Sequence, residues 1–317
     1  GLLSSVKLRI DEDRSRNGRF LLTGSQRFHL MRDVAESLAG RVAVMELLPF
    51  SWAELTPHRE RSMENCLWNG GYPDPALAPA KRDPWVRAYL DTYVERDIRQ
   101  LQNVKDLWAF EQFVQAVALR HGQPLNMASL SRDSGVSQPT AKKWLALLEA
   151  SYLILLLRPW ERNYGKRLTR GPKVVFVDSL IPAALTRQPS AEALVAGSMG
   201  GAFFEGFVAS EAAKVFTNRG LKPDLWHWRT NDGHEVDLLI QTPGGLVAVE
   251  TKLTASPNSF HTRGLRRFRD LAGDDASREA LLVCRVKEPQ PMPHGVTALP
   301  WHKFPAWLDE QISGERP

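Results

Sequence analysis

Cysteine is scarce in this sequence, whose 317 residues include only Cys66 and Cys284. The two are far apart, and no Cys-x-x-Cys or Cys/His cluster is present, so a structural zinc site is not expected. This cysteine usage favours a reducing, cytoplasmic environment. Long apolar runs are also lacking, because the longest, residues 152–157, is much too short to cross a bilayer. The first residues do not have the layout of a signal peptide, so neither a membrane span nor secretion is predicted.

A strong excess of one charge sign is missing as well. The chain has 41 Lys and Arg against 36 Asp and Glu, with a formal net charge of +5 and a pI near 9.3. This balance permits nucleic-acid binding without requiring it. The length and the 43% hydrophobic content are sufficient for two or three domains, each with its own core.

The first fifty residues have the pattern of the closing half of an α/β layer. Residues 19–22 form a short buried-strand candidate that ends in the small polar residues 23–25. A helix over about residues 30–38 and a second strand over residues 42–47 are expected to follow. Because a parallel sheet normally has more strands than this, the partner strands are expected upstream of the first residue.

The middle of the chain has the pattern of a winged helix-turn-helix. Asn126 is expected to cap one short helix and Ser137 a second helix over residues 138–150. An apolar run, a basic loop that extends to Lys173 and a strand over residues 174–177 would form the wing. DNA is the expected partner, although winged helices also serve as protein-interaction modules. The expected DNA contacts are Gln138, Thr140, Lys142 and Lys143 on the second helix and Lys166 and Arg167 on the wing.

A hairpin near residue 240 carries the residues that predict chemistry. Strands over residues 235–241 and 246–252 are joined by a Pro-Gly-Gly turn. If Gln241 pairs with Leu246, Asp237 lies opposite Glu250, because side chains alternate along a strand. Lys252 then shares their face.

Two facing carboxylates and a lysine are the groups needed for metal-assisted phosphodiester hydrolysis. Oxygen ligands suit Mg²⁺, and Lys252 would stabilise an attacking water or the developing phosphate charge. Glu205, on a helix expected from about residue 201, could reach the same metal, and Glu211 is a second candidate. The predicted metal ligands are therefore Asp237, Glu250 and Glu205, with Lys252 completing the catalytic set. A solvated acidic hairpin without chemistry is the alternative.

Several short segments together resemble one family. They are residues 18–25, 37–41, 70–73, 93–97, 200–205 and 228–237. The chain resembles prokaryotic AAA-type ATPases of unassigned role that have a central winged helix and a carboxy-terminal domain similar to PD-(D/E)xK nucleases. The resemblance implies an α/β multidomain fold with four parts. These are the remnant of a P-loop AAA-type α/β domain (1–55), a helical connector or lid (56–105), the winged helix-turn-helix (106–180) and a restriction-endonuclease-like α/β domain (181–317).

The resemblance also implies a nucleotide site. Thr23 and Ser25 would occupy a sensor-like position near the γ-phosphate, and Arg41 would act as a phosphate-sensing or finger arginine. However, the sequence contains no Gly-x-x-x-x-Gly-Lys-Ser/Thr motif. We therefore interpret the chain as the carboxy-terminal two-thirds of a longer parent that binds ATP, and expect no tight ATP binding by this portion alone.

These observations leave two main functional hypotheses. The first is the DNA-binding portion of an AAA-type ATP-binding protein with a Mg-dependent nuclease domain. The second is a non-catalytic, nucleotide-dependent switch that binds DNA or a partner and uses the nuclease-like fold as a scaffold. A protein-interaction module without a nucleic-acid partner is a third hypothesis, and a homo-oligomer is left open.

Overall fold

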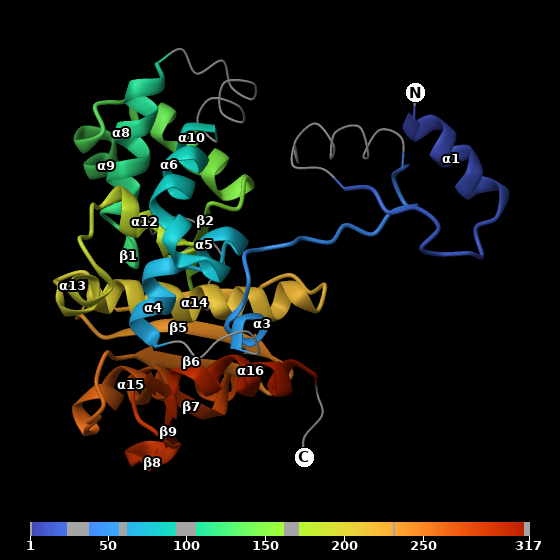
Figure 1. The fold of residues 1–317 in the computed structure, drawn as a ribbon. Helices are drawn as coiled ribbons and strands as arrows, with labels where there is room; N and C mark the ends of the chain where they lie inside the picture. Colours follow the sequence, from blue (N-terminus) through green and yellow to red (C-terminus); the bar gives the residue numbers. More distant parts are fainter. Residues whose placement is uncertain are drawn as a thin grey trace.

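The computed structural model describes residues 2–23, 38–56, 62–92, 106–161, 171–230 and 232–313. A mixed sheet crosses most of the molecule (Figure 1), and its described strands lie in the order β1-β3-β2-β4-β5-β6-β7-β9-β8. The strands are β1 Gln123–Pro124, β2 Ile154–Pro159, β3 Lys173–Phe176, β4 Leu225–Arg229, β5 Glu235–Thr242, β6 Gly245–Thr251, β7 Ala276–Cys284, β8 Gln290–Met292 and β9 Val296–Pro300.

The amino-terminal region differs from the expected α/β layer. Helix α1 (Leu2–Glu12) lies apart from the sheet, at the end of an extended segment (Figure 1). Residues 19–22 and 42–47 are both described, and neither forms a strand, so these two predictions are wrong. The physical reason is that a strand needs a hydrogen-bonded neighbour, and no described strand lies against either segment. Most of the helix expected over residues 30–38 lies outside the described residues.

Short helices lead from this region to the body of the molecule. They are α3 (Trp52–Leu55), α4 (Met63–Asn69), α5 (Pro73–Leu77), the 3₁₀ turn η2 (Pro79–Lys81) and α6 (Arg82–Thr92). Gly70 ends α4 with φ +63°, and a Cβ there would overlap the Asp178 carboxylate. The next amide, Gly71 N, donates to Asp178 Oδ2 at 2.6 Å. The Gly-Gly turn therefore anchors this connector to Asp178, the second residue after β3.

The helices and strands expected for the middle of the chain are present. They are α8 (Leu107–Ala118), α9 (Met127–Asp133) and α10 (Gln138–Ala150), and β1, β3 and β2 pair antiparallel beside them. Asn126 Oδ1 accepts from Ser129 N at 2.9 Å, and Ser137 caps α10 through Thr140 N. Both predicted caps are confirmed. The segment 162–170, which includes Lys166 and Arg167, lies outside the described residues.

The carboxy-terminal third joins this middle region through one continuous sheet. Strand β2 pairs parallel with β4, β4 to β6 run as an antiparallel meander, and β7 pairs parallel with β6. Helices α12 (Leu180–Leu185) and α13 (Ala191–Ala196) lead into α14 (Gly200–Asn218). The final elements are the 3₁₀ turns η4 (Ser259–Thr262), η5 (Gly273–Asp275), η6 (Pro293–Gly295) and η7 (Trp301–Lys303) and the helices α15 (Arg263–Ala272) and α16 (Phe304–Ser313).

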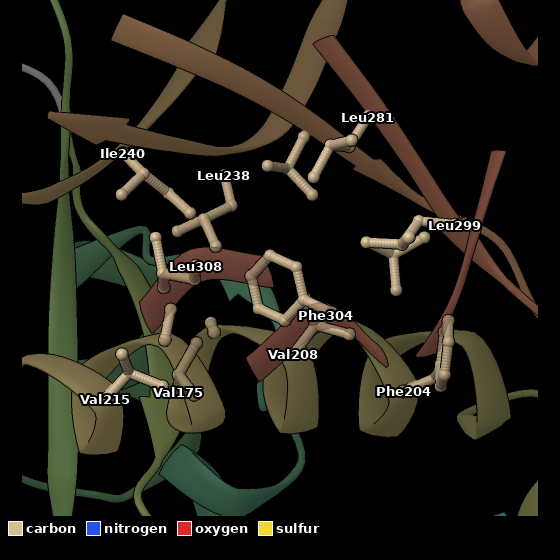
Figure 2. Packing of buried hydrophobic residues seen from close by; sticks show 14 of the residues in the cluster. Val175, Phe204, Val208, Val215, Leu238, Ile240, Leu281, Leu299, Phe304 and Leu308 are labelled. Carbon is tan, nitrogen blue, oxygen red and sulfur yellow. The ribbon is translucent and has the colours of Figure 1, made fainter. Parts of the chain in front are cut away.

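Two apolar layers hold this sheet from opposite faces. One packs α14 and α16 against the strands, and Figure 2 shows Phe304 facing Leu238 and Phe204 lying nearest Leu299. The other layer places the apolar side of α15 against alternate residues of β5, β6 and β7. Because successive strand residues point to opposite faces, both faces can be buried, and the strands read as nearly continuous apolar runs. No helix in the described part of the chain is long and apolar enough to span a membrane.

Candidate functional site

The β5–β6 hairpin brings two of the expected site carboxylates together. Gln241 pairs with Leu246 and Leu238 with Val249, so the expected register is confirmed. The next position in this register places Asp237 opposite Glu250, and both residues are buried. Asp237 Oδ2 accepts hydrogen bonds from the backbone N and the Oγ1 of Thr251, both at 2.9 Å. These bonds hold the Asp237 carboxylate at the end of the hairpin where β6 finishes.

Lys252 bridges the two carboxylates. Its Nζ donates to Glu250 Oε1 at 2.6 Å and lies 3.9 Å from Asp237 Oδ2. The Lys252 side chain is 39% exposed, whereas those of Asp237 and Glu250 are almost fully covered. Lys252 is therefore the most exposed side chain of this set.

The third expected carboxylate, Glu205, approaches the cluster from α14. It forms an ion pair with Lys173, and the Lys173 Nζ is also 3.7 Å from Asp237 Oδ1. The side chain of Lys173 is only 5% exposed. Our expectation that Lys173 belongs to a basic, DNA-facing loop is therefore wrong, because it is the first residue of β3 and faces the acidic cluster. The sequence signal was weak, since a lysine before an apolar strand is usually a solvated flank.

Burial and mutual repulsion control the charges of this cluster. Burial, and then the negative charge of Asp237, raise the pKa of Glu205 and of Glu250 to about 8. For Lys173, burial opposes the charged form, but the negative charges of Glu205 and Asp237 outweigh it and raise the pKa. Lys252 shows the same balance, with Asp237 and Glu250 raising its pKa. Glu205 and Glu250 therefore take up protons near neutral pH.

The donor set suits a magnesium ion bound by few protein ligands. Mg²⁺ is often held by one or two carboxylates together with water and substrate phosphate. Glu250 Oε2 is buried and has no hydrogen-bond partner among the described residues, so it is an available oxygen ligand beside Asp237. Within the described ranges, however, no three His, Cys, Asp or Glu side chains are grouped closely enough to hold a metal ion by themselves. A cation at this place would therefore have to share Asp237 and Glu250 with water or substrate ligands.

Glu211, the second candidate on α14, belongs to another contact. Its carboxylate accepts from Trp52 N at 2.8 Å and from Lys214 Nζ at 3.0 Å. Glu211 therefore attaches the start of α3 to helix α14. The structure gives Glu211 no part in the acidic cluster.

The residues expected to contact DNA on α10 lie on its outer side. Gln138, Lys142 and Lys143 are exposed, and Thr140 is half-buried with its Oγ1 2.8 Å from Ser137 Oγ. The buried face of the same helix, which includes Trp144 and Leu148, packs into the core of this region. The exposed face of α10 therefore carries two lysines, Lys142 and Lys143.

The expected nucleotide-sensing residues are separated from this cluster. Arg41 forms an ion pair with Asp11 at 2.8 Å and donates to Ala39 O. Thr23 is exposed at the edge of the described segment, and Ser25 lies outside the described residues. The structure thus gives Arg41 a partner within the amino-terminal segment.

Three family models match the chain, in succession. An AAA domain model matches residues 1–56, a domain of unknown function (DUF8612) matches residues 60–192, and a second domain of unknown function (DUF4143) matches residues 200–304. The DUF4143 domain is found in AAA-ATPase-associated proteins. The first and last matches together support an AAA-type family.

Two curated mycobacterial proteins are similar over most of the chain. They are the uncharacterized proteins Mb2031c of Mycobacterium bovis and Rv2008c of Mycobacterium tuberculosis. Each is 32% identical over 250 residues, which cover 76% of this chain and 53% of the relative. The chain thus spans about half the length of the curated relatives it matches. No solved structure matches it significantly.

Proposed function

We propose that this chain is the DNA-binding and DNA-cleaving portion of an AAA-type ATP-binding protein. The observation that carries the proposal is the convergence of Asp237, Glu250, Lys252 and Glu205 at one end of the β5–β6 hairpin. Two buried carboxylates beside a partly exposed lysine are groups that suit a metal-dependent phosphodiesterase. The meander β4-β5-β6 with parallel β7 and helix α14 supports a PD-(D/E)xK-like arrangement.

In this proposal each residue has a separate task. Asp237 and Glu250 would hold Mg²⁺, which supplies charge neutralisation at a phosphate and lowers the pKa of a bound water. Lys252 would bind the scissile phosphate or orient the attacking water through its ammonium group. Glu205 and Lys173 would fix the position of Asp237 from the opposite side.

The test is cleavage of supercoiled, linear and single-stranded DNA in Mg²⁺, Mn²⁺ or EDTA. We expect metal-dependent cutting that is lost in Asp237→Asn and Lys252→Met. Glu279→Gln, which changes an exposed carboxylate of β7, is the control and should cut like the parent. Cutting that is equal in all three variants, or that persists in EDTA, would contradict the assigned residues.

A non-catalytic switch is the second candidate, and one observation favours it. Lys173 already places a positive charge between Glu205 and Asp237, so this end of the cluster is neutralised by the protein itself. The nuclease-like sheet would then act as a scaffold for DNA or partner binding. Binding of DNA with a steep salt dependence, weakened by the double change Lys142→Ala and Lys143→Ala, without cutting in any metal, would favour the switch.

For the nucleotide, we propose that a longer parent protein binds ATP while this chain alone does not bind it tightly. The support is the AAA domain match at residues 1–56, together with the absence of a phosphate-binding Gly-Lys-Ser/Thr motif from the sequence. Titration calorimetry with ATP and Mg²⁺ tests this, and nanomolar affinity for this chain would contradict it.

A further inference from the structure

A basic and aromatic surface lies on the outer side of α15 and the preceding turn η4. We call the set Phe260, Arg263, Arg266 and Arg267 the α15 surface. Leu265, Phe268 and Ala272 cover the inner side of the helix and pack against the sheet. The three arginines occupy positions i, i+3 and i+4 and are all exposed, as helical periodicity requires. They form one cationic face at the start of α15.

An exposed aromatic ring completes this surface. Phe260 is 64% exposed, and the guanidinium of Arg263 lies 4.4 Å from the centre of its ring. The turn that carries the ring is held by Asn258, whose Oδ1 accepts from Phe260 N at 3.0 Å. Asn258 N in turn donates to His261 Nδ1 at 3.1 Å. Phe260 is therefore held in place by its backbone while its ring is available for stacking.

The α15 surface borders the candidate site. A Cβ added at Gly264 would lie 3.8 Å from Glu250 Oε2, so the first turn of α15 touches the acidic cluster. The acidic residues of the same segment, Asp270, Asp274 and Asp275, follow toward the far end of the helix. Positive charge is thus concentrated at the end that faces the site.

We propose that the α15 surface binds a single strand of DNA and leads it to Lys252 and Glu250. Arginine guanidinium groups would bind consecutive phosphates, and Phe260 would stack on a base, which is how many proteins hold single strands. A stacking ring needs an unpaired base, because the faces of paired bases in a duplex are already covered by their neighbours. This inference rests on the proposed function in that it takes DNA as the substrate.

The experiment measures binding separately from cleavage. Fluorescence anisotropy in EDTA would follow a labelled oligothymidylate of about 20 nucleotides, with the matching duplex and RNA strands as competitors. We expect Phe260→Ala to weaken single-strand binding by about tenfold or more, which corresponds to the loss of one stacked base. The double change Arg266→Gln and Arg267→Gln should lower the slope of log K against log salt by about 1.4, at about 0.7 per phosphate contact.

Two controls carry the same chemistry at other exposed positions. Trp108→Ala removes an exposed aromatic ring from α8, and the double change Arg87→Gln and Arg187→Gln removes two exposed arginines far along the chain from α15. Both control proteins should bind single strands like the parent. Losses as large as those of the α15 variants would overturn the proposal, because they would reflect general charge or folding rather than this surface.

The outcomes distinguish this inference from the proposed function. Binding in EDTA that depends on Phe260, without cutting in any metal, supports the surface and rejects the nuclease. Metal-dependent cutting of single strands that is unchanged in both α15 variants rejects the surface and supports the nuclease. Tighter binding of the duplex or of RNA than of single-stranded DNA also overturns the proposal.

Discussion

Removal of the buried ammonium group of Lys173 provides a direct test of how the acidic cluster is held together. In Lys173→Met the side chain keeps most of its volume but loses its charge, so that Glu205 and Asp237 remain buried without their shared partner. Breaking a buried ion pair by removing one member typically costs about 3–5 kcal/mol. We expect a loss of this size at about pH 8.5, where Glu205, with its pKa of about 8 in the parent, is mostly ionised, and a smaller loss near pH 6, where Glu205 is protonated.

A divalent cation should replace part of the lost charge. A ligand that binds only the folded state at about one hundred times its Kd stabilises it by about 2.7 kcal/mol. Mg²⁺ should therefore recover much of the stability of Lys173→Met and recover less in the parent, where the lysine already occupies one side of Asp237.

Native-state hydrogen exchange at the amides of β5 and β6 is the suitable assay, because it reports the opening free energy of this part of a multidomain chain. Lys303→Met is the matched control, since the side chains of Lys303 and its partner Glu288 are 42% and 76% exposed, and an exposed pair contributes about 1 kcal/mol or less. The reasoning is refuted if Lys173→Met costs no more than the control, or if its cost is independent of both pH and Mg²⁺.

Three further changes test other parts of the structure. Burial and the charge of Asp237 raise the pKa of Glu205 from 4.5 to about 8, so the free energy of unfolding should fall as the pH rises between these values. In thermal unfolding, Glu205→Gln should make this dependence on pH weaker. An unchanged pH dependence would contradict the prediction. Gly70→Ala should destabilise the protein by several times the ~1 kcal/mol expected for Gly135→Ala. Both glycines have a positive φ, but only at Gly70 would the added Cβ meet a carboxylate. Equal melting temperatures of the two variants would refute this. Ser137→Ala should cost about 1 kcal/mol in urea unfolding through loss of the α10 cap, and no loss would contradict the cap.

Local patterns in the sequence predicted the carboxy-terminal hairpin and the two capped helices. Alternation on both sides of a Pro-Gly-Gly turn is sufficient to predict the register, which the Gln241–Leu246 pair confirms. The caps at Asn126 and Ser137 are equally local, because each side chain bonds an amide three residues away. Such features depend on neighbours in the sequence and not on the rest of the fold.

The features that sequence reasoning missed depend on distant partners. Residues 19–22 and 42–47 are apolar enough for strands, but a strand also needs a paired neighbour, which periodicity cannot supply. Lys173 was assigned to a solvated loop because its carboxylate partners lie 32 and 64 positions further along the chain. The basic face of α15 has a clear helical spacing, but only the fold shows that its first turn touches Glu250.

The charge balance of the cluster leads to a last prediction, that metal and DNA bind cooperatively. Above about pH 8, where Glu205 and Glu250 are ionised, three carboxylates face two ammonium groups, so the cluster carries one net negative charge. A divalent cation reverses this to one positive charge, and a phosphodiester group restores neutrality. Each ligand alone therefore leaves an uncompensated charge near buried groups, which is costly, whereas both together do not.

Mn²⁺ titration followed by electron paramagnetic resonance should show at least about tenfold tighter Mn²⁺ binding in the presence of a non-hydrolysable oligonucleotide, which amounts to about 1.4 kcal/mol of coupling. Equal Mn²⁺ affinity with and without the oligonucleotide would mean that the phosphate does not reach the cluster.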